Sequence, residues 1–197
     1  MPSVDIYDDL MTAIHQRNAI EVAVLLEQWP DDVNDHMLNC AVSYNAPEIV
    51  ALLAPRAVGE CRDGLAYAVS LGHLECVQAL TPYCSDDECK SALSEAVTHG
   101  HRRMEIVEYL AQHCDVKSSY ALFNAVLHEE YEIFEFLFPL SDPWRLLDET
   151  RKNFQEGPPN NHERKCIAWF EQRMAEEQRK TLLNHICDTA VVRVSKI

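Results

Sequence analysis

The chain has 197 residues, of which 47% are hydrophobic and 25% charged, a balance typical of a soluble globular protein with a sizeable core. No apolar run approaches the roughly 18 residues of a membrane-spanning helix, and the first residues, MPSVDIYDDL, lack the basic and apolar regions of a secretory signal. We therefore expect a cytoplasmic protein without membrane contact, in which the eight cysteines are reduced thiols.

The formal net charge of −15 is unevenly distributed along the chain. Residues 1–149 contain 26 acidic and 8 basic residues, a net charge of −18, whereas residues 150–197 contain 6 acidic and 9 basic residues, a net charge of +3. Binding of phosphates requires the opposite sign, so nucleic acid is not expected as a partner. A protein with a basic surface is expected instead, because complementary fields accelerate association.

One pattern occurs five times in the first three-quarters of the chain. Each copy opens with Leu-x-x-Ala, from Leu10–Ala13 to Leu122–Ala125, and the five alanines are 28, 27, 28 and 29 residues apart. In the third copy, LAYAVSLGHLECVQAL (65–80), apolar residues recur at helical spacing on both sides of a Gly-His turn. Helices this short are marginal alone, so the pattern predicts helical hairpins stacked as an all-α solenoid.

The turn between the two helices varies among the copies. Gly72 can adopt the left-handed conformation that ends a helix, and we expect Asn18 and Asn45 to take that place in the first two copies. Glu129 stands there in the fifth copy, and the fourth has two additional residues, Arg102-Arg103, before its second helix.

These segments resemble the Leu-His-x-Ala-Ala-x-x-Gly-His-x-Glu-Ile-Val-x-x-Leu-Leu core of ankyrin repeats, over roughly residues 5–140. The copies are near 28 residues, shorter than the usual 33 or so, and they lack the Asp-x-x-Gly-x-Thr-Pro turn. The resemblance implies an ankyrin-like solenoid of about five helix-turn-helix repeats over residues 1–140, with short loops.

Residues 141–197 depart from the repeat. Asp142-Pro143 has the sequence of a helix N-cap followed by Pro at the first helical position, which predicts a helix to about Phe154. A breaker segment, QEGPPN (155–160), precedes a long helix from Asn161 to about Cys187, and residues 191–194 are left open as a short strand or a frayed end. We expect this region to be a helical cap for the open end of the solenoid.

By resemblance, the chain would bind another protein through its loops and through exposed residues at the end of each first helix. The corresponding helix residues are Tyr44, Ser70, Leu71, Thr98, His99, Leu127 and His128. The acidic loop residues expected to steer the partner are Asp31, Asp32, Asp86, Asp87 and Glu88. Leu71 and Leu127 are open to a second interpretation, in which they only pack on the neighbouring helix.

The sequence predicts no catalytic residue, no metal site and no cofactor. The densest metal-ligand group, His99, His101, His113 and Cys114, lacks the paired spacing that zinc requires. The main hypothesis is therefore a monomeric, non-enzymatic protein-binding module.

Two alternatives remain. The chain could be an acidic inhibitor of a basic toxin or nuclease, such as an immunity protein or an effector delivered into a host cell. It could also be an enzyme that uses residues of its last third: His162, Glu163, Lys165, Cys166 and His185.

Overall fold

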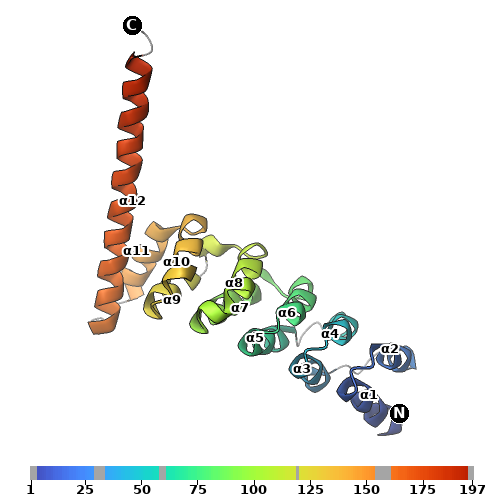
Figure 1. Ribbon diagram of the computed structural model, residues 1–197. Coiled ribbons are helices and arrows are strands. Elements are labelled where there is room, and N and C mark those ends of the chain that lie inside the picture. Colours follow the sequence, from blue (N-terminus) through green and yellow to red (C-terminus); the bar gives the residue numbers. More distant parts are fainter. Residues whose placement is uncertain (1–3, 29–33, 58–60, 119, 154–160, 195–197) are drawn as a thin grey trace. The chain divides into compact units, whose positions relative to one another are not determined.

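The computed structural model describes residues 4–28, 34–57, 61–118, 120–153 and 161–194 (Figure 1). The regular elements within these ranges are all helices, which confirms the all-α class. Contacts divide the chain into two compact units, Met1–Ser141 and Asp142–Ile197.

The first unit consists of five pairs of helices, and a short turn joins the two helices of each pair. The pairs are α1 (Val4–His15) with α2 (Ala19–Gln28), α3 (Asp35–Ser43) with α4 (Pro47–Leu53), α5 (Cys61–Leu71) with α6 (Leu74–Leu80), α7 (Asp86–Thr98) with α8 (Met104–Ala111), and α9 (Ala121–Leu127) with α10 (Tyr131–Leu137). Short 3-10 turns are η1 (Thr81–Tyr83), η2 (His101–Arg103), η3 (Val116–Ser118) and η4 (Phe138–Leu140).

The five pairs follow one another in sequence order within this unit (Figure 1). Each odd-numbered helix from α1 to α9 contacts the next odd-numbered helix, and each even-numbered helix from α2 to α10 contacts the next even-numbered one. The unit is therefore a two-layered helical solenoid. We call α1, α3, α5, α7 and α9 the first-helix layer, and their partners the second-helix layer.

The residues that define the sequence pattern form the core between the layers. The leucines and alanines of the Leu-x-x-Ala segments are at most 1% exposed: Leu10, Leu38, Leu65, Leu93, Leu122, Ala13, Ala41, Ala68, Ala96 and Ala125. The closing leucines of the second helices are equally buried: Leu26, Leu53, Leu80, Leu110 and Leu137. A short helix gains most of its stability from such burial, which explains why the pattern persists through all five pairs.

The first helices all end with a residue in the left-handed region. The five residues are Arg17, Asn45, Gly72, Gly100 and Glu129, with φ between 48° and 79°. In the first, second, third and fifth pairs, the next N–H donates to the carbonyl of the repeat alanine at 2.8–3.1 Å. This hydrogen bond is typical of the Schellman motif, which satisfies carbonyls at a helix end.

The expected turn residue of the first pair is wrong by one position. Arg17, not Asn18, has the positive φ. Asn18 instead caps α2, because its side chain exchanges hydrogen bonds with Glu21, accepting from the Glu21 N–H at 3.2 Å and donating to the Glu21 carboxylate at 2.8 Å. The additional residue of this copy therefore lies after the turn and serves as an N-cap.

Polar side chains also connect consecutive pairs. His73 Nδ1 donates to the carbonyl of Val42 at 2.8 Å, and Arg103 Nη2 donates to the carbonyl of Ser70 at 2.8 Å. Each bond runs from the start of a second helix back to the first helix of the preceding pair. The Val42 carbonyl also accepts the N–H of Asn45, so His73 adds a second donor near the end of α3, while Arg103 supplies a donor to a carbonyl near the end of α5.

The second unit contains α11 (Pro143–Asn153) and α12 (Asn161–Val194). The predicted cap at Asp142 is confirmed, since its Oδ1 accepts the Arg145 N–H at 3.2 Å. α12 continues past the expected end at Cys187 and includes residues 191–194, which are neither a strand nor a frayed end. Leu146, Leu147, Phe170 and Met174 are buried. The predicted breaker at 155–160 lies outside the described residues.

Candidate functional site

The carboxyl ends of the first helices bring equivalent residues of the five pairs into two rows. Counted from the repeat alanine, the residue two positions later is His15, Ser43, Ser70, Thr98 or Leu127. The residue three positions later is Gln16, Tyr44, Leu71, His99 or His128. We call these ten residues the helix-end surface. It includes all seven helix residues predicted to bind a partner, so the repeat geometry places them in register along one layer.

Three hydroxyl groups of the helix-end surface share one arrangement. Ser43 donates to the carbonyl of Cys40, Ser70 to that of Tyr67, and Thr98 to that of Glu95, at 2.8, 2.8 and 2.7 Å. A hydroxyl has one hydrogen and two acceptor lone pairs. With the hydrogen used within its own helix, each of these oxygens offers acceptor capacity to a donor from outside.

The apolar members differ in exposure. Leu71 is 38% exposed, so neighbouring helices cover its side chain only in part. Leu127 and Tyr44 are half-buried, and the Tyr44 ring lies 5.2 Å from the ring of His15 in the preceding pair. Tyr44 therefore also holds two neighbouring pairs together, while His99 and His128 are exposed.

A pocket of about 420 Å³ lies on the first-helix layer between α3 and α5, next to the helix-end surface. It is lined by His36, Asn39, Cys40, Ser43 and Tyr67. Of these five, only Ser43 stands at a helix-end position that the repeat pattern singles out. The spacing of 36, 39, 40 and 43, which places them on one face of a helix, is the signal that could have found the α3 side. Tyr67 comes from the next pair and required the solenoid geometry.

The side chains that line this pocket can form hydrogen bonds. Cys40 Sγ lies 3.8 Å from His36 Nε2, but burial raises the pKa of the Cys40 thiol. A nucleophilic cysteine needs the reverse, a lowered pKa. The pair is therefore a thiol beside an imidazole and not an activated thiolate.

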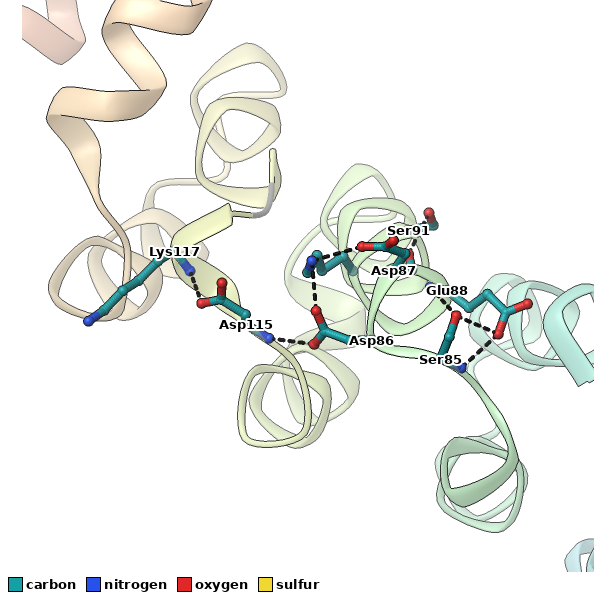
Figure 2. Close-up of polar contacts among 8 residues, drawn as sticks. Ser85, Asp86, Asp87, Glu88, Ser91, Asp115 and Lys117 are labelled. Atoms are coloured by element: carbon teal, nitrogen blue, oxygen red, sulfur yellow. Dashed lines mark hydrogen bonds and ion pairs between the residues drawn. The ribbon is translucent and has the colours of Figure 1, made fainter.

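The predicted acidic residues 86–88 lie in the first turn of α7 and not in a loop, as Figure 2 shows. Glu88 accepts the Ser85 N–H at 2.7 Å, and Ser85 Oγ accepts the Glu88 N–H at 3.3 Å, which together form a capping box. Asp86 and Asp87 both pair with Lys90, at 2.7 and 2.8 Å.

Asp86 also accepts the N–H of Asp115 at 2.8 Å, a contact that joins the start of α7 to the loop after α8 (Figure 2). The bonds from Lys90 and from the Asp115 N–H lower the pKa of the Asp86 carboxyl. These acids thus have local roles in capping and bracing α7, in addition to the charge they contribute. Asp31 and Asp32, predicted with them, lie outside the described residues.

His99, His101, His113 and Cys114 are the densest group of possible metal ligands in the sequence. His113 stacks on Tyr109 with ring centroids 4.1 Å apart, and burial raises the pKa of Cys114 to about 12. Within the described residues, no three His, Cys, Asp or Glu side chains gather as a metal site. Six described cysteines have no disulfide bond: Cys40, Cys61, Cys76, Cys84, Cys89 and Cys114.

The residues of the alternative enzyme hypothesis belong to α12, but their side chains lie outside the described part of the structure: His162, Glu163, Lys165, Cys166 and His185. Among the described residues, no helix has the length and apolar character to cross a membrane.

A comparison with known protein families matches part of the solenoid. Residues 65–145 match the family model of ankyrin repeats in three copies. The match begins at Leu65 in α5 and extends through α10 into α11. A comparison with curated protein sequences found no match to this chain.

Proposed function

Residues 65–145 of this chain are ankyrin repeats, which are modules of protein–protein interaction, and from that premise we propose that the chain binds a basic protein through its helix-end surface. The same left-handed turn also ends the first helices of the two preceding pairs, at Arg17 and Asn45. The helix-end surface therefore extends over all five pairs. The binding face would then be continuous from α1 to α9.

The observation that carries the proposal is the exposed Leu71 between hydroxyl oxygens with acceptor capacity. Leu71 follows Ser70 directly and is flanked along the layer by Ser43 and Thr98 of the adjacent pairs. An apolar anchor surrounded by polar groups is the usual composition of a protein interface. The hydroxyl oxygens next to Leu71 can accept hydrogen bonds, so the partner should supply donors opposite them.

Charge supports a basic partner. Residues 1–141, which form the first unit, contain 23 acidic and 7 basic residues, a net charge of −16. Even with Asp86 and Asp87 paired to Lys90, the field around this unit is strongly negative. Such a field raises the encounter rate with a basic protein and weakens as salt screens it.

The experiment is capture of partners from the native cell on the immobilised chain. Leu71→Asp should abolish capture of a specific protein that the original chain retains. Ile20→Asp is the matched control, because Ile20 is 80% exposed on α2 of the second-helix layer. Equal capture by both variants would contradict binding through the helix-end surface, and capture that does not weaken with salt would contradict a basic partner.

We also propose that residues 141–197 act as a helical cap and that the protein works in a reducing compartment by binding alone. The lack of a disulfide bond among the six described cysteines supports the compartment. The raised pKa of Cys40, beside His36, supports a role without nucleophilic chemistry. The open end that any solenoid must cover supports the cap. A chain ending at residue 141 should then unfold at a lower temperature than the full chain.

A further inference from the structure

We propose that the pocket between α3 and α5 receives an arginine side chain of the partner. The inference rests on the proposed function, since it names the chemical group that would enter one part of the binding face. The pocket shares Ser43 with the helix-end surface, so a peptide lying on that surface passes its opening.

The pocket offers acceptors to a donor. Ser43 Oγ already donates its hydrogen to the carbonyl of Cys40, which leaves its lone pairs available. The amide oxygen of Asn39 is buried and has no hydrogen-bond partner. An unsatisfied buried acceptor carries a free-energy cost that a donor would remove. Asn39 lines the pocket, and its terminal torsion is broad and roughly two-fold, so a rotation of the amide would bring this oxygen toward a bound donor.

The pocket also offers an aromatic face. Tyr67 projects from α5 into the lining and is 39% exposed. A guanidinium group is planar, carries five N–H donors and stacks on aromatic rings. A single group can therefore donate to the Asn39 and Ser43 oxygens and stack on Tyr67. An ammonium group has donors but no plane to stack, and a neutral amide lacks the charge.

The charges nearby favour a cation. The lining contains no Lys or Arg, and the exposed carboxylates of Asp35 and Asp63 belong to the two helices that form it. Asp63 precedes Tyr67 by one helical turn, which places both on the same side of α5. Arg62, the cation on α5, lies close enough to Glu88 of the following pair to contribute, after Ser85, to lowering the pKa of that carboxyl.

The test uses three peptides and the full-length chain labelled with ¹⁵N. The probes are acetyl-Gly-Arg-Gly-amide, its Lys counterpart and its citrulline counterpart, which has the shape of arginine without the charge. Added to the protein at equal concentration, the arginine peptide should shift the amide signals of residues 36–43 and 67. The lysine and citrulline peptides should shift them about threefold less or not at all.

Variants identify the groups responsible. Tyr67→Ala and Asn39→Leu should each reduce the shifts by about threefold or more, whereas Tyr67→Phe should retain them because the ring remains. Tyr83→Ala is the matched control, since Tyr83 is 37% exposed but lies in η1, away from the pocket lining. The same spectra show whether each variant is folded.

Three results would overturn the proposal: no shifts with the arginine peptide, equal shifts with citrulline or lysine, or shifts that survive both Tyr67→Ala and Asn39→Leu. If the arginine peptide causes no shifts while Leu71→Asp still abolishes partner capture, only this inference fails. If Leu71→Asp leaves capture intact, the proposed binding face fails, whatever the peptides do.

Discussion

Arg103 reaches back across one repeat to hydrogen-bond the carbonyl of Ser70, at 2.8 Å from its Nη2. Its guanidinium lies against Gly72, so closely that an added Cβ there would clash with it. Arg103 is one of the two residues that make the fourth copy longer than the others. The insertion thus supplies a polar connection between the third and fourth pairs, at the end of the helix that carries Leu71.

Arg103→Ala should destabilise the fold by about 1 kcal/mol, because a helix-end carbonyl loses a charged donor. This loss of stability is small for a hydrogen bond from a charged group, because Nε of Arg103 is itself buried without a partner. Removing the side chain also removes the free-energy cost of that unpaired Nε. Arg102→Ala, at the exposed neighbouring residue, is the control and should change stability by less than about 0.5 kcal/mol. Urea unfolding of both variants checks the difference, and equal midpoints would contradict the connection.

Glu129→Gly should stabilise the protein by about 1 kcal/mol, because Glu129 holds a left-handed φ of 60° that only glycine adopts without penalty. Its side chain is exposed, so little contact is lost. Glu132→Gly, three residues later in α10, should have the opposite effect and cost about 1 kcal/mol as a glycine within a helix. Thermal unfolding measures both, and destabilisation by Glu129→Gly would refute the strain.

Glu88→Gln should make the protein less stable at neutral pH, with a difference from the original chain that disappears in acid. The hydrogen bonds from Ser85 lower the pKa of Glu88 below its usual 4.5. A carboxyl with a lowered folded-state pKa stabilises the fold above its unfolded pKa, and this contribution is lost as the pH falls through the folded value. Urea unfolding at pH 7 and near pH 3 provides the test. A difference that persists unchanged in acid would show that the charge has no role.

Cys84 and Cys114 should react slowly with iodoacetamide at pH 8 in the folded protein. Burial raises the pKa of each thiol to about 12, which leaves very little of the reactive thiolate. In urea the same residues should regain ordinary reactivity. Mass spectrometry of the alkylated peptides follows both rates, and similar rates in the folded and unfolded protein would contradict the raised pKa values.

Much of the solenoid could be predicted because its determinants are local and repeated. The Leu-x-x-Ala spacing located all five first helices, and Asp142-Pro143 marked the start of α11. Asn18 was misplaced because a single inserted residue can lie on either side of a turn, and only backbone geometry shows that Arg17 takes the left-handed conformation.

The candidate site was predictable only in part, for a physical reason. The ends of the first helices follow from the repeat register, so the positions of Ser70, Leu71 and Thr98 on this layer could be predicted. The pocket requires side chains of α3 to face Tyr67, 27 residues beyond Cys40 in the chain, and depends on how adjacent pairs pack. The acids 86–88 are expected in a loop from their acidic sequence, although Ser85-x-x-Glu88 is the pattern of a capping box and is the signal that places them in the first turn of α7.

The central claim is that this solenoid binds a protein along the first-helix layer, and hydrogen–deuterium exchange of the chain with its captured partner tests it most directly. We expect slower exchange on binding in peptides that cover residues 36–44, 65–72 and 95–100, with little change in α4 and α6 of the second-helix layer. Protection confined to α4 and α6, or to residues 142–194, would contradict the account.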